Sequence, residues 1–314
     1  MNPYELYYSI QVLKFTIHQL EKNRKFKKMN PSHDKNDELT LLAVHAHPDD
    51  ESISTGGILS KYSAKGIRTV LAYGTRGEAG DILNPEFVAP KPGLNIKEIR
   101  AIELAAAVRV LTVGKVYFLG YRDSGMAGSP ENLHPQAFAQ ADIQEATARL
   151  VKIIRRVRPQ VIVTYNEKGT YLHPDHIMAN RVTLRAFQAS GDARFEIGEA
   201  LEPWQPTKLY YTAIPLERIR RMYRIVEERG EEPGFDPDVL GTPEEKISTV
   251  VDVREYLSQK LAALNCHQSQ MNPNSVIRRM SEEMREEAMG YEHFQCVQGC
   301  TAPDTKESDL FEGF

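Results

Sequence analysis

Cysteine, tryptophan and net charge are all scarce in this sequence. Its three cysteines are too few for a disulfide framework, and their odd number favours a reducing compartment, so we expect a cytoplasmic protein. Lysine and arginine number 39 against 43 aspartates and glutamates, a net charge of −4. This balance gives no reason to expect nucleic acid as a partner. The longest apolar runs are far shorter than the 18 residues that would predict a membrane span.

What the sequence contains is an ordinary globular mixture over 314 residues, with 41% apolar and 26% charged side chains. The first segment, residues 1–38, is expected to be a helical extension. Apolar residues recur through 4–20 and a basic cluster follows at 22–28. The helix is expected to pack on the body or on another subunit of a homo-oligomer, although a membrane surface or another partner is the alternative.

From residue 39 onward, short apolar runs alternate with amphipathic stretches. The predicted strands are Leu39–His45, Thr69–Tyr73, Val116–Leu119, Val161–Tyr165 and Lys208–Ile214. The predicted helices between them are Ser54–Lys65, Ile96–Leu111, Asp142–Arg156 and His176–Ala189. This alternation indicates an α/β fold with a Rossmann-like, doubly wound and mostly parallel sheet, which we expect to form a catalytic domain over 39–215.

The chain after Pro215 is more charged and has a different pattern. Residues 230–245 are rich in proline, glycine and acid and predict a loop, whereas Leu257–Leu264 and Val276–Ala288 predict two helices. We expect 216–314 to be a helical C-terminal region that completes the substrate pocket.

Two polar clusters follow predicted strands. The first strand runs into His45-Ala-His-Pro-Asp-Asp-Glu51, and the fourth is followed by Tyr171-Leu-His-Pro-Asp-His176. If the strand order is 3-2-1-4-5, the first and fourth strands are neighbours. Ligands of such sheets bind beyond the carboxyl ends of the strands, so the fold would bring the two clusters face to face.

Histidine and aspartate together are a sound ligand set for zinc, and three protein ligands leave a position for water. The adjacent Asp49 and Asp50 allow one carboxylate to bind metal while the other accepts a proton. The alternative is that one of these aspartates caps the following helix and the histidines are polar linkers.

The sequence resembles the LmbE-like (PIG-L) zinc-dependent N-deacetylases. The resemblance rests on Ala46-His-Pro-Asp-Asp-Glu51 with His173-Pro-Asp-His176, and extends through Gly77–Pro85, Arg100, Asp123–Met126 and Thr164–Asn166. It is close over about residues 40–190 and looser over 208–290, where His267 and Gln270 form a His-x-x-Gln segment. The segments are most similar to the mycothiol-pathway branch, which comprises a deacetylase and an S-conjugate amidase.

The resemblance implies a role for each matching residue. It makes His47, Asp50 and His176 the ligands of one Zn²⁺ per chain, with Fe²⁺ as another possible occupant. It makes Asp49 the general base, His173 a group that stabilises the charged intermediate, Asp175 the residue that orients His173, and Tyr171 a donor to the substrate carbonyl. It makes Arg100, Asp123 and Met126 sugar-binding residues.

The predicted function is a zinc-dependent hydrolase that removes an acetyl group from the amide nitrogen of an N-acetylglucosamine-type amino sugar. The alternative within the family is an amidase that cleaves a mycothiol-like thiol S-conjugate. Two rivals lie outside it: a carbohydrate-binding protein without turnover, and a metal-dependent phosphoesterase, which would favour a two-metal site richer in ligands.

Three further groups contain residue types that could act in catalysis or bind metal. His45 shares a strand face with His47 and is expected to be a satisfied core histidine. Glu51 could order the loop or contact solvent, and it is not assigned to the metal. His293, Cys296 and Cys300 could form part of a second zinc site, although no fourth ligand is evident.

Overall fold

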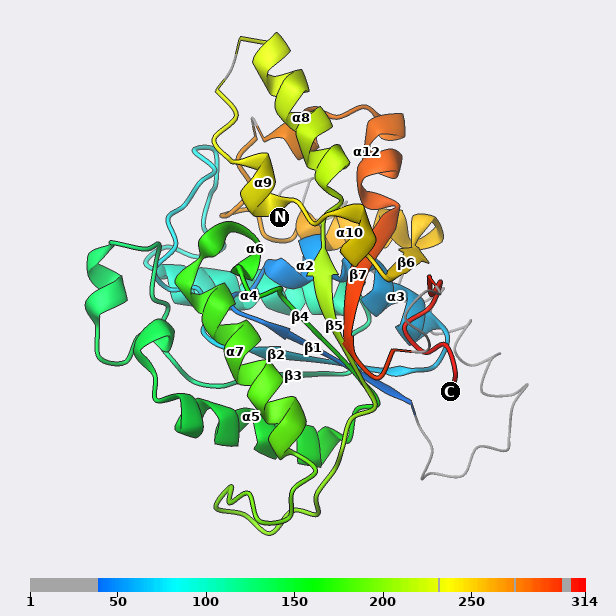
Figure 1. Ribbon diagram of the computed structural model, residues 1–314. Coiled ribbons are helices and arrows are strands. Elements are labelled where there is room, and N and C mark those ends of the chain that lie inside the picture. The colour runs from blue at the N-terminus through cyan, green and yellow to red at the C-terminus, as the bar shows by residue number, and fades with distance from the viewer. Residues whose placement is uncertain (1–38, 231, 274, 301–305) are drawn as a thin grey trace.

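The computed structural model describes residues 39–230, 232–273, 275–300 and 306–314 (Figure 1). The helix predicted over residues 4–20 and the basic cluster that follows it lie outside the described residues. Within them, no helix is long and apolar enough to cross a membrane.

A seven-stranded sheet in the order β3-β2-β1-β4-β5-β7-β6 forms the centre of the fold. Its parallel strands are β1 (Thr40–His45), β2 (Arg68–Tyr73), β3 (Lys115–Phe118), β4 (Val161–Thr164) and β5 (Lys208–Ala213). The predicted α/β class and the predicted order of these five strands are confirmed. Strand β1 lies between β2 and β4, and all six of its residues are buried, as is typical of a central parallel strand.

The C-terminal region adds two strands that the sequence did not predict. They are β7 (Tyr291–Gln298), antiparallel to β5, and β6 (Thr249–Asp252), antiparallel to β7 (Figure 1). The apolar pattern of β7 is interrupted because one of its buried positions is Glu292, which is only 4% exposed. The single helix predicted over Val276–Ala288 is two short ones.

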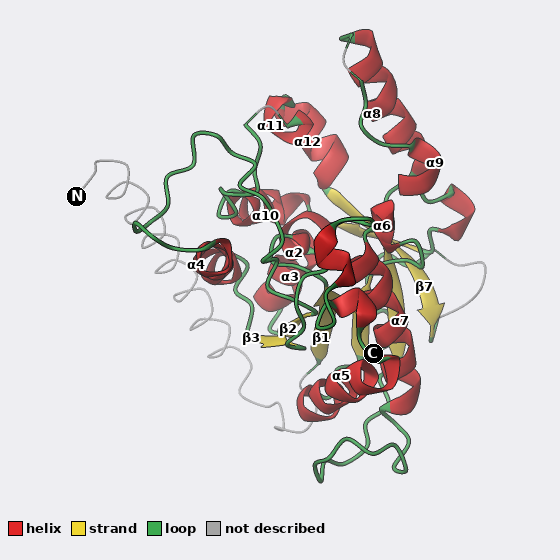
Figure 2. Cartoon of the chain, turned by 90° about the vertical axis from the view of Figure 1, so that its left-hand side faces the viewer, coloured by secondary structure: helices red, strands yellow, loops and turns green. Residues whose placement is uncertain are grey.

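Helices cover both faces of the sheet, as the doubly wound fold predicts. Figure 2 shows α5 (Ile143–Val157) and α7 (Pro174–Ala189) on one side of the strands, and α3 (Gly56–Ala64), α4 (Ile96–Val110) and α10 (Leu257–Leu264) on the other. Each set closes its own hydrophobic core against alternate side chains of β1. The other α-helices are α2 (Asp50–Ser54), α6 (Gly169–Leu172), α8 (Leu216–Glu228), α9 (Pro237–Leu240), α11 (Val276–Arg279) and α12 (Glu282–Met289). Short 3₁₀ turns are η1 (Pro130–Leu133), η2 (Phe138–Gln140), η3 (Glu244–Lys246) and η4 (Arg254–Tyr256).

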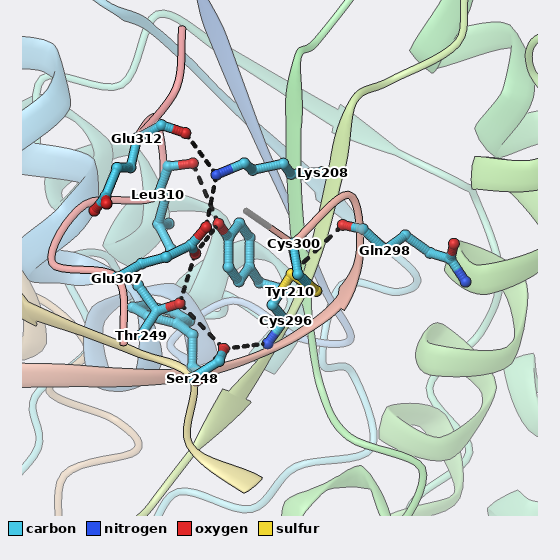
Figure 3. The surroundings of a disulfide bond; sticks show 11 residues. Lys208, Tyr210, Ser248, Thr249, Cys296, Gln298, Cys300, Glu307, Leu310 and Glu312 are labelled. Atoms are coloured by element: carbon cyan, nitrogen blue, oxygen red, sulfur yellow. Dashed lines mark hydrogen bonds and ion pairs between the residues drawn. A yellow bond between two sulfur atoms is a disulfide. The ribbon is translucent and has the colours of Figure 1, made fainter. Parts of the chain in front are cut away.

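The possible second zinc site is wrong. Cys296 and Cys300 are joined by a disulfide at the end of β7, and their sulfurs are therefore not thiolates that could bind zinc (Figure 3). Cys266 is the remaining free cysteine. With two of the three cysteines paired, the cysteine count no longer argues for a reducing compartment.

Candidate active site

The carboxyl ends of β1 and β4 bring the two polar clusters together. The ring centres of His47 and His173 are 4.6 Å apart, and those of His47 and His176 are 5.3 Å apart. Because β1 and β4 are parallel neighbours, the loops that follow them leave the sheet at the same edge. The predicted juxtaposition is therefore present, although 126 residues separate His47 from His173 in the sequence.

Ring nitrogens of His47, His173 and His176 lie within 4.8 Å of one another and could hold a metal ion. Asp50 lies between two of them, with Oδ1 at 3.5 Å from His176 Nε2 and Oδ2 at 3.6 Å from His47 Nδ1. A second possible group is made by His47, Asp123 and Asp175.

His176 provides the test of whether this group fits a metal. The residue is 1% exposed, yet neither ring nitrogen has a hydrogen-bond partner among the described residues. Burial lowers its pKa to about 4, so the ring is neutral near pH 7. A buried polar group without a partner is costly, whereas a neutral imidazole is the form that binds metal. The site therefore fits a metal ion.

Asp50 is fixed by two donors. Its Oδ2 accepts a hydrogen bond from the His47 backbone N–H at 2.8 Å and another from the Tyr165 hydroxyl at 2.7 Å. Burial disfavours ionisation of Asp50, but the nearby histidines and the hydrogen bond with His47 hold its pKa well below the usual value. The carboxylate is thus charged and oriented toward His176, as a ligand requires.

Asp49 lies in a different environment. It occupies the position before α2, but its side chain makes no capping hydrogen bond, which argues against the helix-cap alternative. One carboxylate oxygen is instead 3.0 Å from the Arg100 guanidinium. Burial raises the pKa of Asp49 to about 6, against the opposing effect of Arg100. A carboxylate with a pKa near neutrality is suited to accept and return a proton.

The backbone of Asp49 is strained. Its φ of 114° with ψ of −33° is a conformation that residues with side chains rarely adopt. Such a conformation costs of the order of 1–3 kcal/mol and persists only where the surroundings enforce it. In this conformation the Asp49 side chain lines the cavity, while its neighbour Asp50 lies against His176.

Arg100, which the family resemblance makes a sugar-binding residue, is buried. It is 3% exposed, and its guanidinium donates to the carbonyl oxygens of Gly77 and Pro48 in addition to its ion pair with Asp49. The structure places Arg100 at the wall of the cavity, in contact with the Asp49 carboxylate.

Asp123 and Asp175 both lie against His47. Nε2 of His47 is 3.5 Å from Asp123 Oδ1 and 3.1 Å from Asp175 Oδ2. The sequence predicted that Asp175 would orient His173, but its carboxylate contacts His47, and it is the Asp175 backbone N–H that donates to His173 Nδ1. The reason is that His173 is the N-cap of α7, so its ring faces the first turn of that helix.

Tyr171 and His173 line the same cavity as Asp49. Tyr171 is 43% exposed, and its ring packs edge-on against His176 with 4.9 Å between ring centres. The neighbouring Thr170 and Leu172 have φ values of 64° and 66°, so a strained turn presents Tyr171 to the cavity. Burial of the ring atoms and the nearby Asp50 raise the Tyr171 pKa, which keeps its hydroxyl protonated as a donor.

A cavity of about 330 Å³ joins these groups. It is lined by His47, Asp49, Asp50, Ala79, Gly80, Asp81, Leu83, Arg100, Asp123, Gly125, Met126, Tyr171, His173 and Gln270. The sequence did not place Asp81 or Gln270 in the site. Gln270 donates to the Asp81 carbonyl at 3.0 Å, so the C-terminal region reaches the rim of the cavity. The His-x-x-Gln segment was the available signal for Gln270.

The structure also shows the surroundings of His45 and Glu51. His45 is fully buried in the core with Nε2 3.0 Å from the Thr55 hydroxyl, but its Nδ1 has no hydrogen-bond partner among the described residues, so the ring is only half satisfied. Glu51 is fully buried behind Asp49 and bonded to His267 of the C-terminal region, a partner that sequence spacing could not reveal.

Comparison with known proteins gives matches over most of the chain. The PIG-L family, described as GlcNAc-PI de-N-acetylase, matches residues 42–187. A 1D-myo-inositol 2-acetamido-2-deoxy-alpha-D-glucopyranoside deacetylase of Acidothermus cellulolyticus is 41% identical over 288 residues, covering 87% of this chain and 94% of that protein. The enzyme of the same name from Thermobispora bispora is 42% identical over 275 residues, covering 84% and 89%.

A solved structure shares the fold. N,N'-diacetylchitobiose deacetylase from Pyrococcus horikoshii has a TM-score of 0.57 at 20% identity and covers 90% of this chain and 93% of that one. The relatives confirm the prediction of a hydrolase that deacetylates N-acetylglucosamine-type amino sugars. The chain therefore belongs to the PIG-L family of de-N-acetylases.

Proposed function

We propose that this protein hydrolyses the acetamide of an N-acetylglucosamine linked to inositol, with zinc held by His47, Asp50 and His176. The observation that carries the proposal is His176 beside the Asp50 carboxylate, with two buried ring nitrogens for which the described part of the chain supplies no hydrogen bond. A bound zinc ion would supply a water of lowered pKa and polarise the substrate carbonyl.

Asp49 is the proton acceptor in this proposal. Its carboxylate lines the cavity and has a pKa of about 6, so near neutral pH it is mostly ionised and can take the proton of the attacking water. The same group then returns the proton to the departing amine, which completes hydrolysis of the amide bond. The Arg100 contact holds the carboxylate in place for both transfers.

Tyr171 and His173 act on the substrate oxygen. As the water attacks, negative charge develops on the carbonyl oxygen, and a protonated Tyr171 hydroxyl donates to it. His173 lies at the same side of the cavity, with its Nδ1 occupied by the Asp175 backbone N–H. Its Nε2 is the nitrogen available to stabilise the charged intermediate.

The remaining cavity residues are proposed to bind the sugar. Met126 is 51% exposed and supplies an apolar surface, and the oxygens of Asp123 already accept backbone N–H groups of Ala79 and Gly125. Asp123 therefore shapes the rim loop as well as facing the cavity. The inositol-linked substrate is proposed because both relatives described above carry that substrate in their names.

The test is release of acetate by the zinc-loaded protein. The inositol-linked N-acetylglucosamine should yield acetate and the free amine, whereas the thiol S-conjugate should react more slowly. Faster cleavage of the conjugate would make the amidase alternative correct. Binding of sugar without acetate release would support the carbohydrate-binding rival, and phosphate release from a phosphoester would support the phosphoesterase. The cytoplasmic location and a homo-oligomer stay predictions.

A further inference from the structure

Glu51 is a fully buried carboxylate directly behind the proposed base. Its Oε2 accepts hydrogen bonds from the Asp49 backbone N–H and from the Tyr73 hydroxyl, both at 2.8 Å. Its Oε1 accepts the Ser52 hydroxyl and lies 2.8 Å from His267 Nε2. An ionised carboxylate offers about four acceptor positions, and all of them are used here.

The hydrogen bond to the Asp49 N–H coincides with the strained conformation of that residue. A backbone φ of 114° needs enforcing contacts. The Asp49 carbonyl accepts the Ser52 N–H of α2 at 3.0 Å, and two further contacts involve its N–H and its side chain. Glu51 holds its peptide group from behind, and Arg100 holds its carboxylate from the side. Releasing the first contact frees the peptide to relax toward an ordinary conformation, which would turn the carboxylate away.

His267 links this contact to the C-terminal region. It follows α10 and lies 216 residues from Glu51 in the sequence, yet both side chains are 0% exposed and paired. Facing a carboxylate, Nε2 of His267 must carry the proton of the bond. The same segment is anchored to α4, because Glu103 accepts both the backbone N–H and the hydroxyl of Ser269.

We propose that Glu51 and His267 form a positioning pair that holds the Asp49 peptide in its strained conformation and so aims the base at the substrate. Neither residue lines the cavity, so neither touches the reacting atoms. The inference rests on the proposed function, in which Asp49 is the base. It also gives the C-terminal region a part in the chemistry beyond closing the pocket.

Glu292 supplies a matched control. It is a buried carboxylate that accepts two backbone N–H groups, those of Gly57 and Ile58, and pairs with a cation, Lys260, at 2.6 Å. It therefore shares with Glu51 a buried carboxylate, a backbone N–H donor and a basic side-chain partner. Its partners lie on α3 and α10 rather than on the catalytic loop, so Glu292→Gln reports the cost of losing a buried charge alone.

The experiment compares Glu51→Gln, Glu292→Gln and Asp49→Asn as zinc-loaded proteins, with kcat, KM, zinc content and Tm measured for each. The amide that replaces the Glu51 carboxylate cannot accept four hydrogen bonds, so we expect kcat to fall about 10–100-fold with KM and zinc content unchanged. Glu292→Gln should lower Tm but keep kcat. Asp49→Asn should lose about 10²–10⁴-fold in kcat.

A second pair of variants tests the same point if Glu51→Gln does not fold. His267→Gln keeps a side-chain N–H that can donate to Glu51, whereas His267→Leu has none. We expect His267→Gln to recover most of the kcat that His267→Leu loses, at equal zinc content.

The outcomes separate the inference from the function on which it rests. If Asp49→Asn is inactive but Glu51→Gln has the kcat of Glu292→Gln, the positioning role is wrong and the base assignment stands. Equal kcat in the two His267 variants would also contradict the pair. If Asp49→Asn is fully active, Asp49 is not the base and both the proposed mechanism and this inference fail.

Discussion

The parallel and antiparallel halves of the sheet differ in whether their buried charged and polar groups have partners. In the antiparallel half, which begins where β5 pairs with β7, Lys208 of β5 pairs with Glu307 at 2.8 Å, and Glu307 also accepts hydrogen bonds from Thr249 and Tyr210 (Figure 3). Beyond the parallel strands β1 and β4, the ring nitrogens of His176 have no hydrogen-bond partner among the described residues, and Asp49 is strained. The first arrangement is closed and stabilises the fold, whereas the second is open to a metal and a substrate.

The largest expected effect comes from removing a ligand in the open half. His176→Ala removes a ring whose nitrogens have no hydrogen-bond partner among the described residues, so folding should be largely preserved while zinc binding is lost. Acetate release should fall to background. Elemental analysis of the purified variant is the measurement, and full zinc occupancy would remove His176 from the site.

Two adjacent carboxylates sharpen the comparison within the open half. Asp49→Asn cannot accept a proton, so activity should fall about 10²–10⁴-fold with zinc retained. Asp50→Asn replaces a charged ligand by a neutral amide, so zinc affinity should fall and activity should recover partly with excess Zn²⁺. The two substitutions are isosteric and neighbouring, which makes each the control of the other. Rescue of Asp49→Asn by zinc would reverse the assignments.

Tyr171→Phe is expected to have the next largest effect. The hydroxyl is needed most when charge develops on the substrate oxygen, so kcat should fall about 10²–10³-fold with little change in KM. Steady-state kinetics on the inositol-linked substrate measures both constants. A change confined to KM would show that Tyr171 binds the substrate rather than the developing charge.

The smallest effect on activity is expected in the closed half. Glu307→Gln leaves Lys208 buried without its charged partner, which should lower the free energy of unfolding by about 3–5 kcal/mol and leave kcat unchanged. The exposed pair of Lys65 and Asp309 is the control, since Lys65→Met should cost only about 0–1 kcal/mol. Denaturant unfolding measures both. A fall in kcat at full folding would contradict the division between the halves.

The same division explains what the sequence could predict. Strands β1 to β5 were predicted because each is a short apolar run, and their order placed His47 beside His176. Strand β7 was missed because Glu292 occupies a buried position, and its pairing with Lys260 and with two backbone N–H groups of α3 makes that burial tolerable. A pairing between side chains 32 residues apart leaves no local pattern.

The sequence predicted which residues form the site better than it predicted which of them contact one another. The two histidine and aspartate clusters were visible as motifs, but the sequence could not show that Arg100 faces Asp49, or that the Asp175 carboxylate contacts His47. These contacts depend on side-chain directions set by α4 and α7. A role for Glu51 in ordering the loop was among the interpretations of the sequence, but its pairing with His267 was not predicted, for the same reason.

The most direct test of the account is a zinc titration of the metal-free protein, with acetate release from the inositol-linked N-acetylglucosamine as the measured rate. If His47, Asp50 and His176 hold one functional zinc ion, the rate should be near zero without metal, rise in proportion to added Zn²⁺ and reach its plateau at one equivalent per chain. Acetate release by the metal-free protein at the rate of the loaded protein would contradict the account.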